Sequence, residues 1–237
     1  MNPKYKILLT CPISSNKAYI LYDWIRYIKK FTYPMDILLV DNSQTHVTSM
    51  RVAAEGINCV HVKSHNLSLR EHMAQCNEIS RMYAIEHGYD FIFSLECDIF
   101  PPLTIIEQLL MHQKPVTAAY YFINMFQNTK PMLQQFEDDG DLKVNGSRNI
   151  DLLEGFLYVN GKLRQIHGPG IGCVLMHKSV FQKIKFRVDT KYDGHADSFL
   201  YVDLLQNNIP IFVDTSIACR HFNQSWGDLK LKYNHNL

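Results

Sequence analysis

The chain has 237 residues, a length that favours one large domain over two. Hydrophobic residues make up 46% of it and charged residues 20%, which excludes a chain that is disordered throughout. The formal net charge of +1 provides no general attraction to phosphate polymers and so disfavours a dedicated nucleic-acid binder.

The cysteines and the N-terminus indicate a compartment. None of the six cysteines forms a CxxC pair, and most lie in apolar runs, where cysteine behaves as a small hydrophobic residue. We therefore expect a cytoplasmic protein without disulfides. The first nine residues lack the apolar core of a signal peptide, and no apolar run approaches the roughly 20 residues of a membrane span, so no transmembrane segment is expected.

The first half of the chain alternates between apolar runs and helical patterns. An apolar run over 6–10 predicts a buried strand that ends at Pro12, because proline cannot donate to a central ladder. Apolar residues at helical spacing over 19–31 predict a helix that packs on the sheet. Further strands are predicted over 35–40, 58–62, 91–95 and 116–122, with helices over 69–87 and from 101 to about 112.

This alternation predicts an α/β fold with a mostly parallel central sheet and helices on both faces. In such sheets, ligands bind beyond the carboxyl ends of the strands. The polar residues after the first, second and fourth strands should then converge on one cleft; they are Thr10, Asp41, Asn42, Glu96 and Asp98.

The second half is less regular. Residues 124–151 are polar and contain turn signals, which predicts a long irregular loop of the kind that often serves as a lid or a binding loop. Residues 156–159, followed by Asn160-Gly161 and a run from Lys162, predict a hairpin. Beyond it we expect strands over 173–176 and 209–213, helices over 179–185 and 197–207, and a polar tail after Trp226.

The sequence Glu96-Cys97-Asp98 is the strongest local signal. It places two acids at positions i and i+2 at the end of a buried strand, where both side chains point to the same side of an extended chain. Paired carboxylates at such a position suit a hard divalent cation, which can neutralise a leaving diphosphate. The alternative is a solvated turn that happens to contain two acids.

Two further positions have a functional and a structural interpretation. His221 follows a buried strand and could bind a metal, with imidazole favouring Mn²⁺ over Mg²⁺, or could be structural. Asp197 opens a helix and could be a catalytic base or a helix cap. The glycines at 168, 170 and 172 match neither a P-loop nor a dinucleotide fingerprint and indicate a tight turn or a close approach to a ligand.

The order of these features resembles the GT-A glycosyltransferases, in particular the broad inverting family-2-like group, over residues 6–222. The resemblance implies a Rossmann-like GT-A domain over 1–237. It would consist of a nucleotide-sugar-binding half (1–122), an acceptor and catalytic half (123–226) and a tail (227–237).

The resemblance also implies roles for individual residues. Glu96-Cys97-Asp98 resembles the DxD motif, with Glu in place of the usual first Asp, so that Glu96 would face the nucleotide and Asp98 would bind the metal. His221 resembles the late histidine that completes the metal site, and Asp197 resembles the base of the "ED" motif, with Ala196 in place of its first acid.

Other positions resemble the donor-binding residues of the group. Thr10 and Pro12 resemble its first-strand loop, and Asp41, with Asn42 beside it, resembles the acid that recognises the base or ribose. Arg70 and Asn77 resemble the Arg and Asn of the helix before the DxD motif, at a looser spacing.

The function implied is that of a hexosyltransferase-like enzyme that uses Mn²⁺ or Mg²⁺. The donor would be a UDP- or GDP-sugar, and the acceptor a glycan, a lipid-linked sugar or another hydroxyl, with a modified DNA base less favoured. A sugar nucleotidyltransferase is disfavoured because the loop over 10–16 has neither glycine nor basic residues. A non-catalytic sugar-nucleotide-binding module is disfavoured because the acid pair, Asp197 and His221 occur together.

Overall fold

The computed structural model describes residues 4–63, 67–125, 128–136, 147–149, 158–189, 191 and 194–222. The first half contains the elements β1 (Ile7–Ile13), η1 (Ser15–Lys17), α1 (Ala18–Ile28), β2 (Asp36–Asp41), α2 (Val47–Ala54), β3 (Asn58–His61), α3 (Leu69–Glu86), β4 (Phe91–Leu95), β5 (Ile99–Phe100) and α4 (Ile105–Met111). The second half contains β6 (Val116–Met125), β7 (Asn128–Pro131), β8 (Gln134–Phe136), β9 (Ser147–Asn149), β10 (Leu163–Ile166), β11 (Cys173–His177), α6 (Lys178–Phe181), α7 (Ala196–Gln206) and β12 (Ile211–His221).

A curled, mostly parallel sheet with helices on both faces confirms the predicted fold class. The strand order is β10-β12-β6-β11-β4-β1-β2-β3. The strands β3, β2, β1 and β4 run parallel, β11 runs antiparallel between β4 and β6, and β12 is parallel to β6. The central antiparallel strand β11 joins the parallel strands of the first half to the strands that begin with β6.

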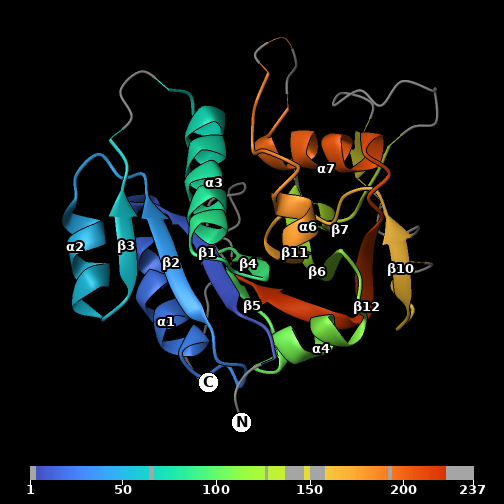
Figure 1. Ribbon diagram of the computed structural model, residues 1–237, viewed down its shortest axis with the longest axis horizontal. Coiled ribbons are helices and arrows are strands. Elements are labelled where there is room, and N and C mark those ends of the chain that lie inside the picture. The colour runs from blue at the N-terminus through green and yellow to red at the C-terminus, as the bar shows by residue number, and fades with distance from the viewer. Residues whose placement is uncertain are drawn as a thin grey trace.

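Alternating side chains of the same strands build two hydrophobic cores, one on each face of the sheet. On one face, Leu8 and Ile92 pack with α3, α6 and α7. On the other, Leu9 and Phe93 pack with α1, α2 and α4. Figure 1 shows α3 and α7 on one side of the sheet and α1 and α4 on the other.

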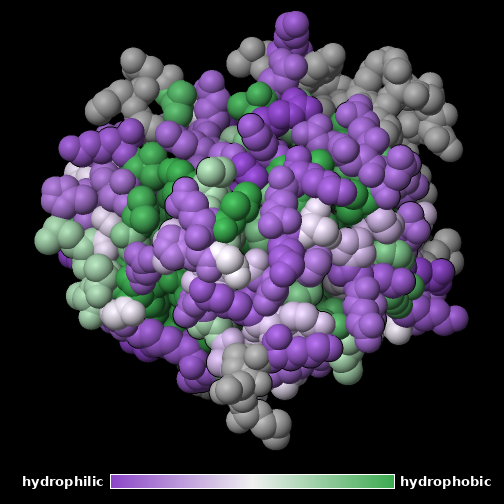
Figure 2. Space-filling model, in the orientation of Figure 1, coloured by the Kyte–Doolittle hydropathy of each residue, from purple (hydrophilic) through white to green (hydrophobic). Residues whose placement is uncertain are grey.

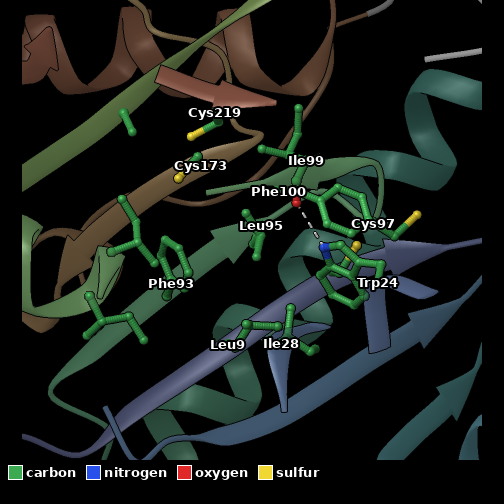
Figure 3. Close-up of a cluster of buried hydrophobic side chains, with 14 of the residues drawn as sticks. Leu9, Trp24, Ile28, Phe93, Leu95, Cys97, Ile99, Phe100, Cys173 and Cys219 are labelled. Carbon is green, nitrogen blue, oxygen red and sulfur yellow. Dashed lines mark hydrogen bonds between the residues drawn. The ribbon is translucent and has the colours of Figure 1, made fainter. Parts of the chain in front are cut away.

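Trp24 of α1 ties the second core to the segment after β4. Its side chain is fully buried, and its Nε1–H donates to the carbonyl of Ile99 at 3.1 Å. Figure 3 shows this hydrogen bond among the apolar side chains around it. Because Ile99 directly follows Asp98, the core holds in place the loop that contains the acid pair.

Helix α3 has the boundaries that its sequence predicts. Ser68 and Glu71 form a capping box: the Glu71 carboxylate accepts from the Ser68 N–H at 2.7 Å, and the Ser68 hydroxyl accepts from the Glu71 N–H at 3.3 Å. After the helix, Gly88 has a φ of +67°, which a glycine adopts without strain.

Several predicted boundaries are wrong. Strand β1 continues past Pro12 to Ile13, because β4 pairs with β1 only as far as Thr10 and a proline is tolerated where one neighbour is missing. The helix expected from residue 101 starts at Ile105, and the helix α2 and the short strand β5 were not predicted at all.

The second half departs further from the sequence-based expectation. The loop predicted over 124–151 contains β7, β8 and β9 among its described residues. The predicted hairpin is absent from the described part: residues 158–159 are not in a strand, and β10 pairs with the distant β12. The strand expected over 209–213 extends to His221 in β12. Trp226 and the tail lie outside the described residues.

Within the described ranges, no helix is both long and apolar enough to cross a membrane. All six cysteines are free thiols. Hydrophilic residues cover much of the face shown in Figure 2, and hydrophobic groups gather toward β2 and β3, where Val60 is 37% exposed.

Trp24→Phe should lower the free energy of unfolding by about 2 kcal/mol, because it removes a buried ring volume and leaves the Ile99 carbonyl without its donor. Urea unfolding followed by far-UV circular dichroism measures this loss. The control is Met111→Leu at a 72% exposed position, which should change stability by less than about 0.5 kcal/mol. Equal stabilities of the two variants would contradict the role given to Trp24.

Candidate functional site

A short antiparallel pairing brings the two ends of the predicted metal site together. Strand β5 pairs with the end of β12, so that His221 lies opposite Ile99 and Arg220 opposite Phe100. The N–H of Phe222 donates to the carbonyl of Asp98 at 2.8 Å. Backbone hydrogen bonds thus hold residues 98 and 221 side by side, although they are far apart in the sequence.

A bulge in β12 sets the direction in which this strand approaches β5. The pairing of β12 with β6 shifts in register between Asp214 and Ala218. The Asp214 carboxylate stabilises the bulge by accepting from the N–H and hydroxyl of Ser216, at 2.9 and 2.6 Å, and from the ring of His112 at 2.7 Å. Partial burial raises the pKa of Asp214, but the hydrogen bonds from Ser216 and His112 outweigh burial and lower this pKa.

Asp98 is a buried carboxylate that is only half satisfied. Its side chain is 1% exposed, and its Oδ2 forms an ion pair with the Lys17 ammonium. The same oxygen lies 3.6 Å from Nε2 of His221. Its Oδ1 is buried and has no hydrogen-bond partner. Burial raises the pKa of Asp98, but the neighbouring His221 and Lys17 outweigh burial and lower it, so the carboxylate is ionised.

The ring of His221 has the orientation that a metal ligand requires. Its Nδ1 lies 2.8 Å from the carbonyl of Phe122, which can only accept, so Nδ1 carries a proton. Nε2 lies 3.6 Å from Oδ2 of Asp98, and loss of its proton would leave a lone pair there for a metal ion. Metal-binding histidines usually donate the N–H of their other ring nitrogen to a carboxylate, a backbone carbonyl or water, which fixes the orientation of the ring. Burial lowers the pKa of His221, but the Asp98 carboxylate outweighs it and raises this pKa.

These two side chains fit a divalent cation that has other ligands as well. The Asp98 carboxylate, whose Oδ1 has no partner, and Nε2 of His221, which lies 3.6 Å from Oδ2, supply two ligand positions. In the part of the chain that the structure describes, no group of three or more His, Cys, Asp or Glu side chains could hold a metal. A six-coordinate Mn²⁺ or Mg²⁺ at this position would need further ligands besides these two side chains.

Two further acids lie beside this pair. Burial, and then the charge of Asp98, raises the pKa of Glu96 to about 7, and the charge of Asp197 contributes to the shift. Burial also raises the pKa of Asp197, whose Oδ1 accepts from the N–H of Ser198 at 2.8 Å. The helix cap itself is His195, so Asp197 lies in the first turn of α7 and is not its cap.

Two buried tyrosines, Tyr121 and Tyr201, contact the glycine-rich turn. The hydroxyl of Tyr201 donates to the carbonyl of Gly170 at 2.6 Å. A Cβ at Gly172 would lie 2.7 Å from the Tyr121 hydroxyl, and one at Gly170 would lie 2.6 Å from it. The glycines therefore make room for Tyr121, whose ring also contacts His221 edge to face at 5.2 Å.

Asp41 and its neighbours order the end of β2. The carboxylate of Asp41 is fully buried and accepts from the N–H and hydroxyl of Ser43, at 2.9 and 2.5 Å, and from the N–H of Ser49 in the first turn of α2, at 2.9 Å. The Asn42 N–H donates to the carbonyl of Ile13 at 3.0 Å. Asp41 thus satisfies a backbone N–H in the first turn of α2, whose N-cap is His46, and a contact of Asp41 or Asn42 with a nucleotide stays a prediction.

The other predicted donor-binding residues occupy different surroundings. Thr10 lies inside the sheet, 2% exposed, between Leu38 and Ser94, whereas Pro12 lies near the end of β1. Arg70 and Asn77 lie seven residues apart on one face of α3, and Asn77 is 4% exposed. Their contacts with a donor likewise stay predictions.

Lys17 and Tyr201 lie close to the acids and were not singled out from the sequence. Tyr201 has the pattern of an ordinary core residue, so no sequence signal separates it. Lys17 carries a weak signal, because it precedes α1 at the N-cap position, where a lysine is unusual.

Glu96→Gln should stabilise the metal-free protein at high pH. The Glu96 carboxyl has a pKa of about 7 in the folded protein and of about 4.5 in the unfolded chain. The folded protein therefore holds a proton on Glu96 that the unfolded chain has released, and the wild type loses stability as pH rises through that window. The variant should gain up to about 3 kcal/mol over the wild type between pH 4.5 and pH 8.

Urea unfolding at both pH values without added metal measures this gain. Glu55→Gln, at a 46% exposed side chain, is the matched control and should follow the wild type. If the free energy of unfolding changed equally with pH in Glu96→Gln and in the wild type, Glu96 would not hold a proton with a raised pKa.

No protein-family model and no curated protein sequence matches this chain. Solved structures match over most of its length. The mannosyltransferase PcManGT from Pyrobaculum calidifontis, in complex with GDP-Man and Mn²⁺, is 10% identical with a TM-score of 0.58, covering 95% of this chain and 59% of that one. TarS of S. aureus, residues 1–349 in complex with UDP-GlcNAc, is 10% identical with a TM-score of 0.57, covering 93% and 60%.

A nucleotidyltransferase is also similar. The CMP:2-keto-3-deoxy-manno-octonic acid synthetase complexed with CTP is 11% identical with a TM-score of 0.53 and covers 88% of each chain. The present chain spans about 60% of the length of the TarS fragment and of the mannosyltransferase. At these identities the similarity establishes the fold, and the chain therefore has the GT-A fold of these glycosyltransferases.

Proposed function

We propose that this protein is a metal-dependent glycosyltransferase that moves a sugar from a nucleotide diphosphate sugar to an acceptor hydroxyl, with inversion. The observation that carries this proposal is the half-satisfied Asp98 carboxylate beside the correctly oriented His221. A bound Mn²⁺ or Mg²⁺ would neutralise the charge that develops on the leaving diphosphate. Asp98 and His221 are the residues that would hold it.

Asp197 is the proposed base. Burial raises the pKa of its carboxyl, which makes the ionised form a better proton acceptor. The Oδ1 of Asp197 is held by the Ser198 N–H, so the carboxylate has a defined orientation at the start of α7. Inversion requires the base to lie on the face of the sugar opposite the leaving diphosphate.

The proposed donor is a UDP- or GDP-sugar, since similar folds bind UDP-GlcNAc and GDP-Man. The acceptor is a glycan, a lipid-linked sugar or another hydroxyl compound. Phe122, which is 39% exposed and whose carbonyl orients His221, offers an aromatic surface beside the site on which an acceptor sugar could stack.

Asp98→Asn should lower metal-dependent turnover by at least about 100-fold, because it removes the charge that holds the cation.

Asp197→Asn should lower turnover by about 100- to 10,000-fold yet leave the affinity for nucleoside diphosphate and Mn²⁺ unchanged. Nucleoside diphosphate release from a panel of UDP- and GDP-sugars with Mn²⁺, with and without acceptors, measures turnover. A thermal shift measures binding.

The control is Asp203→Asn, which alters an acid on the same helix that forms an ion pair with Arg187 at 2.7 Å. It should retain normal turnover. Full activity of Asp98→Asn would refute the metal site, and full activity of Asp197→Asn would refute the base. Pyrophosphate release from a nucleoside triphosphate and a sugar phosphate would instead identify a nucleotidyltransferase.

A further inference from the structure

We infer that Lys17 is a diphosphate-binding residue that neutralises Asp98 until the donor arrives. This inference rests on the proposed function, because it assigns to Lys17 a ligand of that same site. Lys17 ends η1 and directly precedes α1, and its ammonium forms an ion pair with the Asp98 carboxylate. The lysine side chain is 26% exposed, so solvent and ligands can reach it from one side.

Helix capping does not account for the position of Lys17. Lys17 is the N-cap of α1, but its side chain makes no capping hydrogen bond. The turn η1, whose own N-cap is Ser14, runs directly into α1, so the helical segment begins before Lys17. The ammonium contacts the Asp98 carboxylate instead of the backbone of the helix. The contact with the acid, and not the helix, is therefore the interaction that this lysine makes in the free protein.

The ion pair leaves Asp98 with capacity for another partner. Lys17 contacts Oδ2, while the buried Oδ1 has no hydrogen bond. An unpartnered oxygen of a carboxylate that is 1% exposed is costly unless a further ligand binds there in the working protein. The ammonium thus balances the charge of Asp98 but does not complete its coordination.

The balance of charge determines which group Lys17 contacts once a cation and a diphosphate are bound. A divalent cation on Asp98 would lie close to the ammonium, and the two positive charges repel each other. A diphosphate supplies several negative oxygens and removes this conflict, because its oxygens can bind the cation and also accept hydrogen bonds from the lysine. Lys17 would therefore move from Asp98 to the diphosphate, and the cation and the diphosphate would each strengthen the binding of the other.

The test compares Lys17→Met with the wild type, using Mn²⁺ alone and Mn²⁺ with UDP or GDP as probes. The electron paramagnetic resonance signal of free Mn²⁺ measures metal affinity, and calorimetry measures nucleotide affinity. Lys17→Met should bind Mn²⁺ alone about tenfold more tightly, because its competitor is gone, and the Mn²⁺–nucleotide pair about tenfold more weakly. Lys17→Arg should restore nucleotide binding in part.

Lys29→Met is the matched control, since it removes a lysine of the same region that is 41% exposed and pairs with Glu55. It should leave both affinities unchanged. Unchanged or weaker binding of Mn²⁺ alone by Lys17→Met, or unchanged nucleotide binding, would overturn the role of Lys17 while the proposed function stands. If the wild type binds neither nucleotide with Mn²⁺, or if Asp98→Asn binds them equally well, the proposed site itself is wrong and the inference falls with it.

Discussion

The candidate site depends on the pairing of β5 with the end of β12. These two strands meet through only a few backbone hydrogen bonds, yet they determine that His221 lies beside Asp98. Trp24, which is buried in the core, holds β5 through its hydrogen bond to the carbonyl of Ile99. The bulge at Asp214 sets the direction in which β12 reaches β5. The site therefore combines side chains from both halves of the chain on a backbone framework that packing holds rigid, which is the condition for a pre-organised ligand site.

The site concentrates charge that the protein alone does not fully compensate. Asp98 is ionised with one unpartnered oxygen, Glu96 has a pKa of about 7, and burial raises the pKa of Asp197. Such an arrangement lowers the stability of the free protein, since buried acids are costly without partners. Natural proteins retain costs of this kind mainly where a ligand compensates them. A cation held by Asp98 would supply the positive charge and would be the partner that its Oδ1 lacks.

Much of the first half could be predicted from the sequence because its signals are local. The apolar run over 91–95 ends at the acid pair, and the capping box of α3 and Gly88 mark that helix. The meeting of residues 98 and 221 was inferred only through a family resemblance, since β5 is two residues long and its partner lies at the far end of the chain. Lys17 has only a weak sequence signal and Tyr201 has none, because tertiary packing alone brings them to the acids.

The most direct measurement of the central claim is the position of the metal itself. Crystals grown with Mn²⁺ and UDP or GDP would locate manganese by its anomalous scattering. We expect a peak within about 2.5 Å of both a carboxylate oxygen of Asp98 and Nε2 of His221, with diphosphate oxygens among the remaining ligands. A nucleotide bound with its manganese away from either residue would contradict this claim.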